Sequence, residues 1–188
     1  MKLLADVYRR RLLIATRSYS AKPTNFNYCV EAVKSTDYNT YLSTLIVPQP
    51  FLRPAFAVKA FNAELMSIGQ SRFDQRIAQI KLQFWKDQLD KVFKAGDSEK
   101  SLSEPISNEL LATVRRFNLT KSWFGRLVEA RKQFLIAGQV KSLAELEKYG
   151  DAQMASVYYI LLSCLNVKNV DCDHVASHLG LSIFHNFS

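Results

Sequence analysis

The chain has 188 residues, of which 48% are apolar and 22% charged, and it contains only 6 Gly and 5 Pro. This length fits one domain, and the apolar fraction excludes an intrinsically disordered chain. The scarcity of Gly and Pro disfavours a many-turned β-sandwich or barrel, so we expect long helices. Three cysteines without a C-x-x-C pair exclude a disulfide framework and a cysteine-based zinc site, and favour a reducing compartment.

The formal net charge of +8 first suggests a nucleic-acid-binding protein, but half of that charge lies in residues 1–19. This segment is rich in Arg, contains Thr and Ser near its end, and has a single acid, Asp6. Such a composition is typical of a mitochondrial transit peptide, which we expect to be removed near Ser20. The alternative is a basic helix that stays attached and lies on a membrane surface.

Residues 20–27 are predicted to be a polar lead-in, and the folded domain is expected over residues 28–188. Apolar residues recur at helical spacing from Tyr28 to Val47, with a break at Ser35-Thr36-Asp37 that would cap a second helix. Pro48 and Pro50 would end this second helix.

The next two helices are expected over residues 51–67, with Gly69 as the stop, and over residues 71–95. The second of these has two apolar stripes. One consists of Phe73, Ile77, Ile80 and Phe84, and the other of Leu82, Trp85, Leu89, Val92 and Phe93. Two stripes predict a central helix that is buried on two sides.

Further helices are expected over residues 107–117 and 120–134. A long helix should start at Ser142, where Ser142-Leu143-Ala144-Glu145 has the form of a capping box, and run to Leu165 with an interruption near Gly150. Asp171 or Asp173 would cap a last helix that ends near Leu181. No stretch of the sequence indicates a strand, so the predicted fold class is all-α.

Four segments, in this order, resemble the squalene/phytoene synthase family: residues 42–65 (LSTLIVPQPFLRPAFAVKAFNAEL), 83–93 (QFWKDQLDKVF), 143–165 and 176–180 (ASHLG). The resemblance spans residues 28–181 and implies an isoprenoid-synthase-like helical bundle of which about the first half is present. After Gly180 the similarity ends. We therefore expect a C-terminally truncated form, from splicing or an incomplete gene model.

The resemblance implies two Asp-x-x-x-Asp motifs that would hold Mg²⁺ and, through it, a prenyl diphosphate. The first motif falls on residues 63–67, where Ala63 and Ser67 lack a carboxylate and Glu64 alone is a poor ligand set. The second would lie beyond Ser188. We therefore expect no catalytic residue, no bound metal and no cofactor.

Four phrases resemble a mitochondrial branch of the family that acts in assembly of respiratory complex I (NADH dehydrogenase): residues 60–65 (AFNAEL), 83–86 (QFWK), 118–121 (NLTK) and 173–178 (DHVASH). This implies a noncatalytic assembly factor on the matrix side of the inner membrane, with peripheral membrane association. Its expected partners are complex I subunits or other assembly factors, and a bound isoprenoid or lipid is compatible with the scaffold.

Two other functions remain open from the sequence. One is a prenyl-diphosphate condensing transferase of the squalene/phytoene synthase type. The other is a mitochondrial RNA-binding module, suggested by Trp85 between Lys81 and Lys86, although such charges normally form a solvated helix face and we expect no nucleic-acid partner.

Two clusters have a functional and a structural interpretation. Asp171, Asp173, His174 and His178 could bind a metal, but a helix cap followed by a polar face is favoured. Tyr158 and Tyr159 could line a prenyl-sized cavity, but core packing is favoured. A half-domain should also expose apolar side chains, including Tyr158, Ile160 and Leu161, and be poorly soluble in isolation.

Overall fold

The computed structural model describes residues 24–69, 75–95, 101–138, 142–167 and 169–185. Within these ranges the regular structure is helical throughout: α2 (Asn25–Thr36), α3 (Tyr38–Leu45), α4 (Gln49–Ser67), α5 (Gln75–Lys94), α6 (Pro105–Phe117), α7 (Lys121–Ala137), α8 (Leu143–Gly150), a π-helical turn (Asp151–Ala155), α9 (Ser156–Cys164) and α10 (Val170–His185). The predicted all-α class is confirmed.

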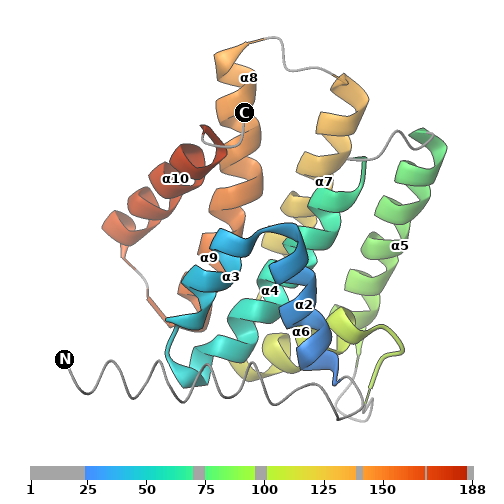
Figure 1. Ribbon diagram of the computed structural model, residues 1–188, viewed down its shortest axis with the longest axis vertical. Coiled ribbons are helices and arrows are strands. Elements are labelled where there is room, and N and C mark those ends of the chain that lie inside the picture. Colours follow the sequence, from blue (N-terminus) through green and yellow to red (C-terminus); the bar gives the residue numbers. More distant parts are fainter. Residues whose placement is uncertain (1–23, 70–74, 96–100, 139–141, 168, 186–188) are drawn as a thin grey trace.

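Helix α4 is the centre of the bundle, where it packs against α2, α6, α7 and α9. Its segment from Ala55 to Phe61 is buried almost all round, with small residues between large ones. A helix that is apolar on every side must be enclosed by others, and the alternation of Ala with Phe lets neighbouring helices approach closely. In Figure 1, α5 forms one edge of the bundle and α10 the opposite edge.

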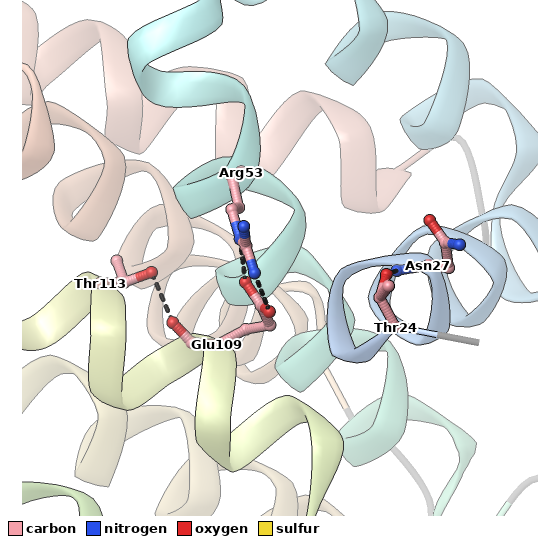
Figure 2. A network of polar contacts seen from close by, with 5 residues as sticks. All are labelled: Thr24, Asn27, Arg53, Glu109 and Thr113. Atoms are coloured by element: carbon pink, nitrogen blue, oxygen red, sulfur yellow. Dashed lines mark hydrogen bonds and ion pairs between the residues drawn. The ribbon is translucent and has the colours of Figure 1, made fainter. Parts of the chain in front are cut away.

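Helices α2 and α3 each begin after a side chain that accepts a hydrogen bond from a main-chain N–H of the first turn. The Thr24 hydroxyl accepts a hydrogen bond from the Asn27 N–H at 3.2 Å, so α2 begins at Asn25, within the expected polar lead-in (Figure 2). The Asp37 carboxylate accepts from the Thr40 N–H at 2.9 Å and caps α3. The expected break at residues 35–37 is therefore confirmed.

A charged pair ties α4 to α6. The guanidinium of Arg53 donates two hydrogen bonds of 2.6 Å to the two carboxylate oxygens of Glu109, as Figure 2 shows. Only 3% of the Glu109 side chain is exposed, against 62% for Arg53. The arginine thus neutralises a buried carboxylate from the solvent side, with the bidentate geometry that favours such pairs.

The two-sided burial predicted for α5 is wrong. Leu82, Trp85 and Leu89 are buried, but Ile77, Ile80 and Phe84 are 40%, 69% and 43% exposed. The reason is that α5 lies at the edge of the bundle, where its main contacts are with α6 and α7 on one side. Phe73, which was expected to belong to the exposed stripe, lies outside the described residues.

The C-terminal helices differ from expectation in two details. Ser142 caps α8 as predicted, since its hydroxyl accepts from the Glu145 N–H at 3.2 Å, and the expected interruption near Gly150 is the π-helical turn. Ile160, however, is buried because α9 packs against α4 and α7. Asn169 rather than Asp171 or Asp173 caps α10, with its side-chain oxygen accepting from the Asp171 N–H at 2.8 Å.

Among the described helices we find none with both the length and the apolar character needed to cross a bilayer.

Candidate functional site

The three motif residues singled out from the sequence do not converge on one point. Ala63 is buried within α4, whereas Ser67 is exposed, and its hydroxyl donates to the Glu64 carbonyl of its own helix at 2.8 Å. Glu64 is half-buried. A hard cation such as Mg²⁺ requires several oxygen ligands. These positions offer it far fewer, because Ala63 has none, the Ser67 hydroxyl is bonded within its own helix, and Glu64 supplies a single carboxylate.

The Glu64 carboxyl lies among α2, α5 and the start of α6. Burial raises its pKa, the nearby Glu104 carboxylate raises it further, and Lys81 partly offsets both. Burial also raises the pKa of the neighbouring Tyr28, and the Glu64 carboxylate raises it further. Glu104 is already used as the cap of α6, where it accepts from the Ser107 N–H at 2.5 Å. These two carboxylates therefore repel each other, and the described residues place no third His, Cys, Asp or Glu with them to hold a metal.

A different face of α4 meets the segment formed by α8, the π-helical turn and α9; we call this contact the α4 seam. Here the Asn62 side-chain oxygen accepts from the Gln153 amide at 2.6 Å, and Tyr149 Oη lies 3.6 Å from the Met66 sulfur. Gln153 is fully buried. It belongs to the π-helical turn, whose extra residue per turn changes which side chains of this segment face α4.

A buried arginine closes one end of the α4 seam. Arg131, on α7, is 5% exposed and donates to the main-chain carbonyls of Met66 (2.9 Å) and Ile68 (2.6 Å) and to Tyr149 Oη (3.1 Å). The last carbonyls of a helix lack partners within the helix, so a cation here satisfies them and opposes the helix dipole. All of these acceptors are uncharged groups.

A half-buried lysine, Lys59, lies one turn before Ala63 on α4. Lys59 Nζ donates to the Thr44 hydroxyl at 2.8 Å, and that hydroxyl donates in turn to the Thr40 carbonyl. Burial lowers the pKa of Lys59 to about 8, although the Asp37 carboxylate partly opposes this shift. Burial likewise raises the pKa of Tyr158, with a further contribution from Asp37.

The sequence analysis missed Lys59 and Arg131. The sequence signal for such a residue is a charged side chain within an apolar helical stretch, for example Lys59 within Ala55–Phe61. Both cations lie beside the degenerate motif, and both would repel a divalent ion. The residues in and around the degenerate motif therefore do not fit the Mg²⁺ that the Asp-rich motifs would hold.

Two other candidate sites from the sequence, the Asp and His residues near the C-terminus and Trp85, are not supported as binding sites by the described residues. Asp171, Asp173, His174 and His178 lie on α10, and the described residues include no group of three or more His, Cys, Asp or Glu side chains placed to hold a metal. Trp85, the proposed base-stacking residue, is buried against Phe61 with ring centroids 5.4 Å apart.

The paired tyrosines and the cysteines take part in packing. Tyr159 packs on Trp123 of α7 at 4.7 Å between ring centroids, and Tyr158 is half-buried. Cys164 is a core residue, and burial raises its pKa to about 11. A thiol with such a pKa is a poor nucleophile at neutral pH.

A shallow pocket lies on the outer surface of α5. It is lined by Asp87, Asp90, Lys91, Lys94 and Ala95. Asp90 is paired with Lys121 and Lys94, so the pocket walls are largely neutralised by their own ion pairs.

Comparison with known proteins gives two groups of relatives. In the first, a bovine protein named NADH dehydrogenase (ubiquinone) complex I, assembly factor 6 is 35% identical over 95% of this chain and 52% of its own length. The human protein of that name is 32% identical over 82% of this chain and 45% of its own length. The Drosophila melanogaster homolog is 38% identical over 81% and 46%. This chain spans about half the length of these curated relatives.

In the second group, the crystal structure of squalene synthase HpnC from Alicyclobacillus acidocaldarius superposes with a TM-score of 0.68 at 19% identity, over 84% of this chain and 57% of that chain. This likeness confirms the isoprenoid-synthase-like fold. A family model described as squalene/phytoene synthase matches residues 33–183, which is most of the chain. The chain therefore belongs to the squalene/phytoene synthase family.

Proposed function

We propose that this chain is a noncatalytic assembly factor for respiratory complex I. The observation that carries this proposal is its identity of 32–38% to proteins named complex I assembly factor 6 from mammals, fly and Dictyostelium discoideum. The match covers 81–95% of the chain. The squalene synthase is only 19% identical, so its similarity supports a shared fold and is no argument for a shared reaction.

The chemistry of the α4 seam supports a role without catalysis. Prenyl-diphosphate chemistry needs clustered anionic oxygens to recruit Mg²⁺. In place of such a cluster, the face of α4 that carries Ala63 is bordered by Lys59, Asn62 and Arg131. The carboxyl of Glu64 lies elsewhere, near Glu104 and Lys81. The face therefore lacks the anionic oxygens that would bring Mg²⁺ to the diphosphate leaving group.

The names of these relatives support a mitochondrial location and an association with complex I assembly, and we propose the details on that basis. We place the protein in mitochondria, on the matrix side of the inner membrane, with residues 1–19 as the import signal. Its partners would be complex I subunits or other assembly factors. Peripheral attachment to the membrane is part of the proposal, as is an isoprenoid or lipid bound without conversion.

Deleting the gene tests the assembly role. NADH:ubiquinone oxidoreductase activity and the assembled complex on a native gel should both fall, while the other respiratory complexes keep near-normal activity. Re-expression of the chain of 188 residues should restore both. Unchanged complex I, or an equal loss of every respiratory complex, would contradict the proposal.

The enzymatic alternative has its own test. We expect no turnover when the purified protein is incubated with Mg²⁺ and labelled farnesyl or geranylgeranyl diphosphate. An active squalene synthase under the same conditions serves as the positive control. Formation of a prenyl product above background would show that the chain is an enzyme despite Ala63 and Ser67.

A further inference from the structure

The outward face of α5 carries three large apolar side chains, Ile77, Ile80 and Phe84, which we call the α5 stripe. They are 40%, 69% and 43% exposed. Their positions are separated by three and four residues, so they lie on one side of the helix and extend over about 10 Å of its length. The opposite side of α5 is already buried through Leu82, Trp85 and Leu89. Within the described residues, the bundle buries one side of α5 and leaves the α5 stripe exposed.

Basic side chains surround the α5 stripe. Helix α5 contains five basic residues against two acidic ones. By helical spacing, Lys91 lies in line with Ile80 and Phe84, while Arg76 and Lys81 lie on either side of the stripe.

The two acidic residues of α5 are occupied by other partners. Asp87 accepts a hydrogen bond from Gln83, and Asp90 pairs with Lys121 and Lys94. Gln83 is neutral, so of the two carboxylates only Asp90 has its charge offset by these contacts. By helical spacing Asp87 lies in line with the α5 stripe, where the basic residues Arg76, Lys81 and Lys91 outnumber it.

We propose that the α5 stripe is the surface that lies on an anionic lipid bilayer. This inference rests on the proposed function, because it assigns a surface to the membrane association proposed there. A bilayer interface accepts apolar side chains into its acyl region and attracts basic ones to its headgroups. Long Lys and Arg side chains beside an apolar stripe can bury their stems and keep their charges at the headgroups.

The shape of the surface favours a bilayer over a protein partner. Helix α5 lies at the edge of the bundle, opposite α10 (Figure 1), and the α5 stripe is on the side of α5 that its neighbours leave exposed. A helical partner would have to bring its own groove to receive a convex ridge, whereas a bilayer surface deforms around it.

Vesicle sedimentation tests the proposal with the whole chain. Changing Arg9, Arg10 and Arg11 to Gln in every protein removes the attraction of vesicles to the basic N-terminal segment. In this background the protein should bind vesicles of phosphatidylcholine mixed with phosphatidylglycerol, and bind phosphatidylcholine vesicles much less. Ile80→Glu and Lys91→Glu should each weaken binding about tenfold, because they remove apolar insertion and headgroup attraction respectively.

Two matched variants serve as controls. Ile136→Glu changes an isoleucine of α7 that is 60% exposed, and Lys132→Glu reverses an exposed charge on the same helix. Both should bind vesicles like the parent, and thermal unfolding should show that all variants remain folded. Equal binding by Ile80→Glu and Ile136→Glu would overturn the proposal, as would failure of the parent to bind anionic vesicles.

A protein partner gives a different pattern of results. If Ile80→Glu abolishes rescue of complex I in the deletion strain but the parent does not bind vesicles, the α5 stripe contacts a protein and the membrane assignment is wrong. If the deletion leaves complex I intact, the assembly role fails. Vesicle binding would then still decide the membrane surface by itself.

Discussion

Replacing Lys59 with Met should stabilise the protein at neutral pH. Lys59 is half-buried in the bundle, where its ammonium donates a hydrogen bond to Thr44 and has the Asp37 carboxylate as a counter-charge. Methionine keeps the length of the lysine stem and adapts its shape to its surroundings. Thr44 keeps an acceptor for its own proton in the Thr40 carbonyl. The substitution therefore removes a buried charge without leaving an unpaired donor.

The size of the effect follows from the pKa of Lys59. Burial lowers this pKa from 10.5 to about 8, which corresponds to roughly 3 kcal/mol of unfavourable free energy for the charged form. Loss of the hydrogen bond to Thr44 offsets about 1 kcal/mol. We expect Lys59→Met to raise the free energy of unfolding by about 2 kcal/mol at pH 7, and the melting temperature by roughly 2–4 °C for each kcal/mol.

The pH dependence identifies the cause. Below about pH 8, Lys59 is charged in both the folded and the unfolded chain, so the full cost of burying the charge is present. As the pH rises from about 8 to 10.5, the folded protein holds Lys59 neutral while the unfolded chain still binds the proton. The cost therefore disappears over this interval. The advantage of Lys59→Met should shrink in parallel.

Urea unfolding of both proteins at a series of pH values measures this difference curve. Other groups that titrate in the same range, such as Cys164 and Tyr158, are common to both proteins and cancel in the difference. The reasoning is refuted if Lys59→Met is less stable than the parent at pH 7. It is also refuted if any gain stays constant between pH 7 and pH 10.5.

Three further predictions concern other parts of the fold, and each is tested by urea unfolding. Arg53→Ala should cost about 2–3 kcal/mol because it leaves the buried Glu109 carboxylate without its cation, and it should cost more than Glu109→Gln; the reverse order would contradict this account. Gly69→Ala should destabilise by about 1 kcal/mol because Gly69 has φ +88°, whereas Gly125→Ala, on a helix with open space at Cβ, should stabilise by up to about 1 kcal/mol. Asp37→Ala should cost about 1 kcal/mol through loss of the α3 cap, and an unchanged midpoint would show that the cap is dispensable.

The helices were predictable because their signals are local. The caps at Asp37 and Ser142 and the stop near Gly69 each involve residues within about four positions of one another. Helical periodicity likewise needs only a few turns of sequence. The same local logic placed the interruption near Gly150, although it could not specify a π-helical turn.

The family could be recognised from the order of several segments, and the matching family model confirmed it. The weakness of the first Asp-rich motif was also visible, because Ala63 and Ser67 have no carboxylate whatever the fold around them. Where Glu64 would lie could not be predicted. Its neighbours, Glu104 and Lys81, come from other helices.

Amino-acid sequence alone determined the helical class, most helix boundaries and the absence of carboxylates at Ala63 and Ser67. Tertiary structure decided which stripe of α5 is buried and that Lys59 is partly desolvated. It also decided that Arg131 donates hydrogen bonds to carbonyls more than 60 positions away in the chain. The physical reason is that burial and charge neutralisation depend on what lies within a few ångströms in space. Helix formation depends mainly on what lies within a few residues along the chain.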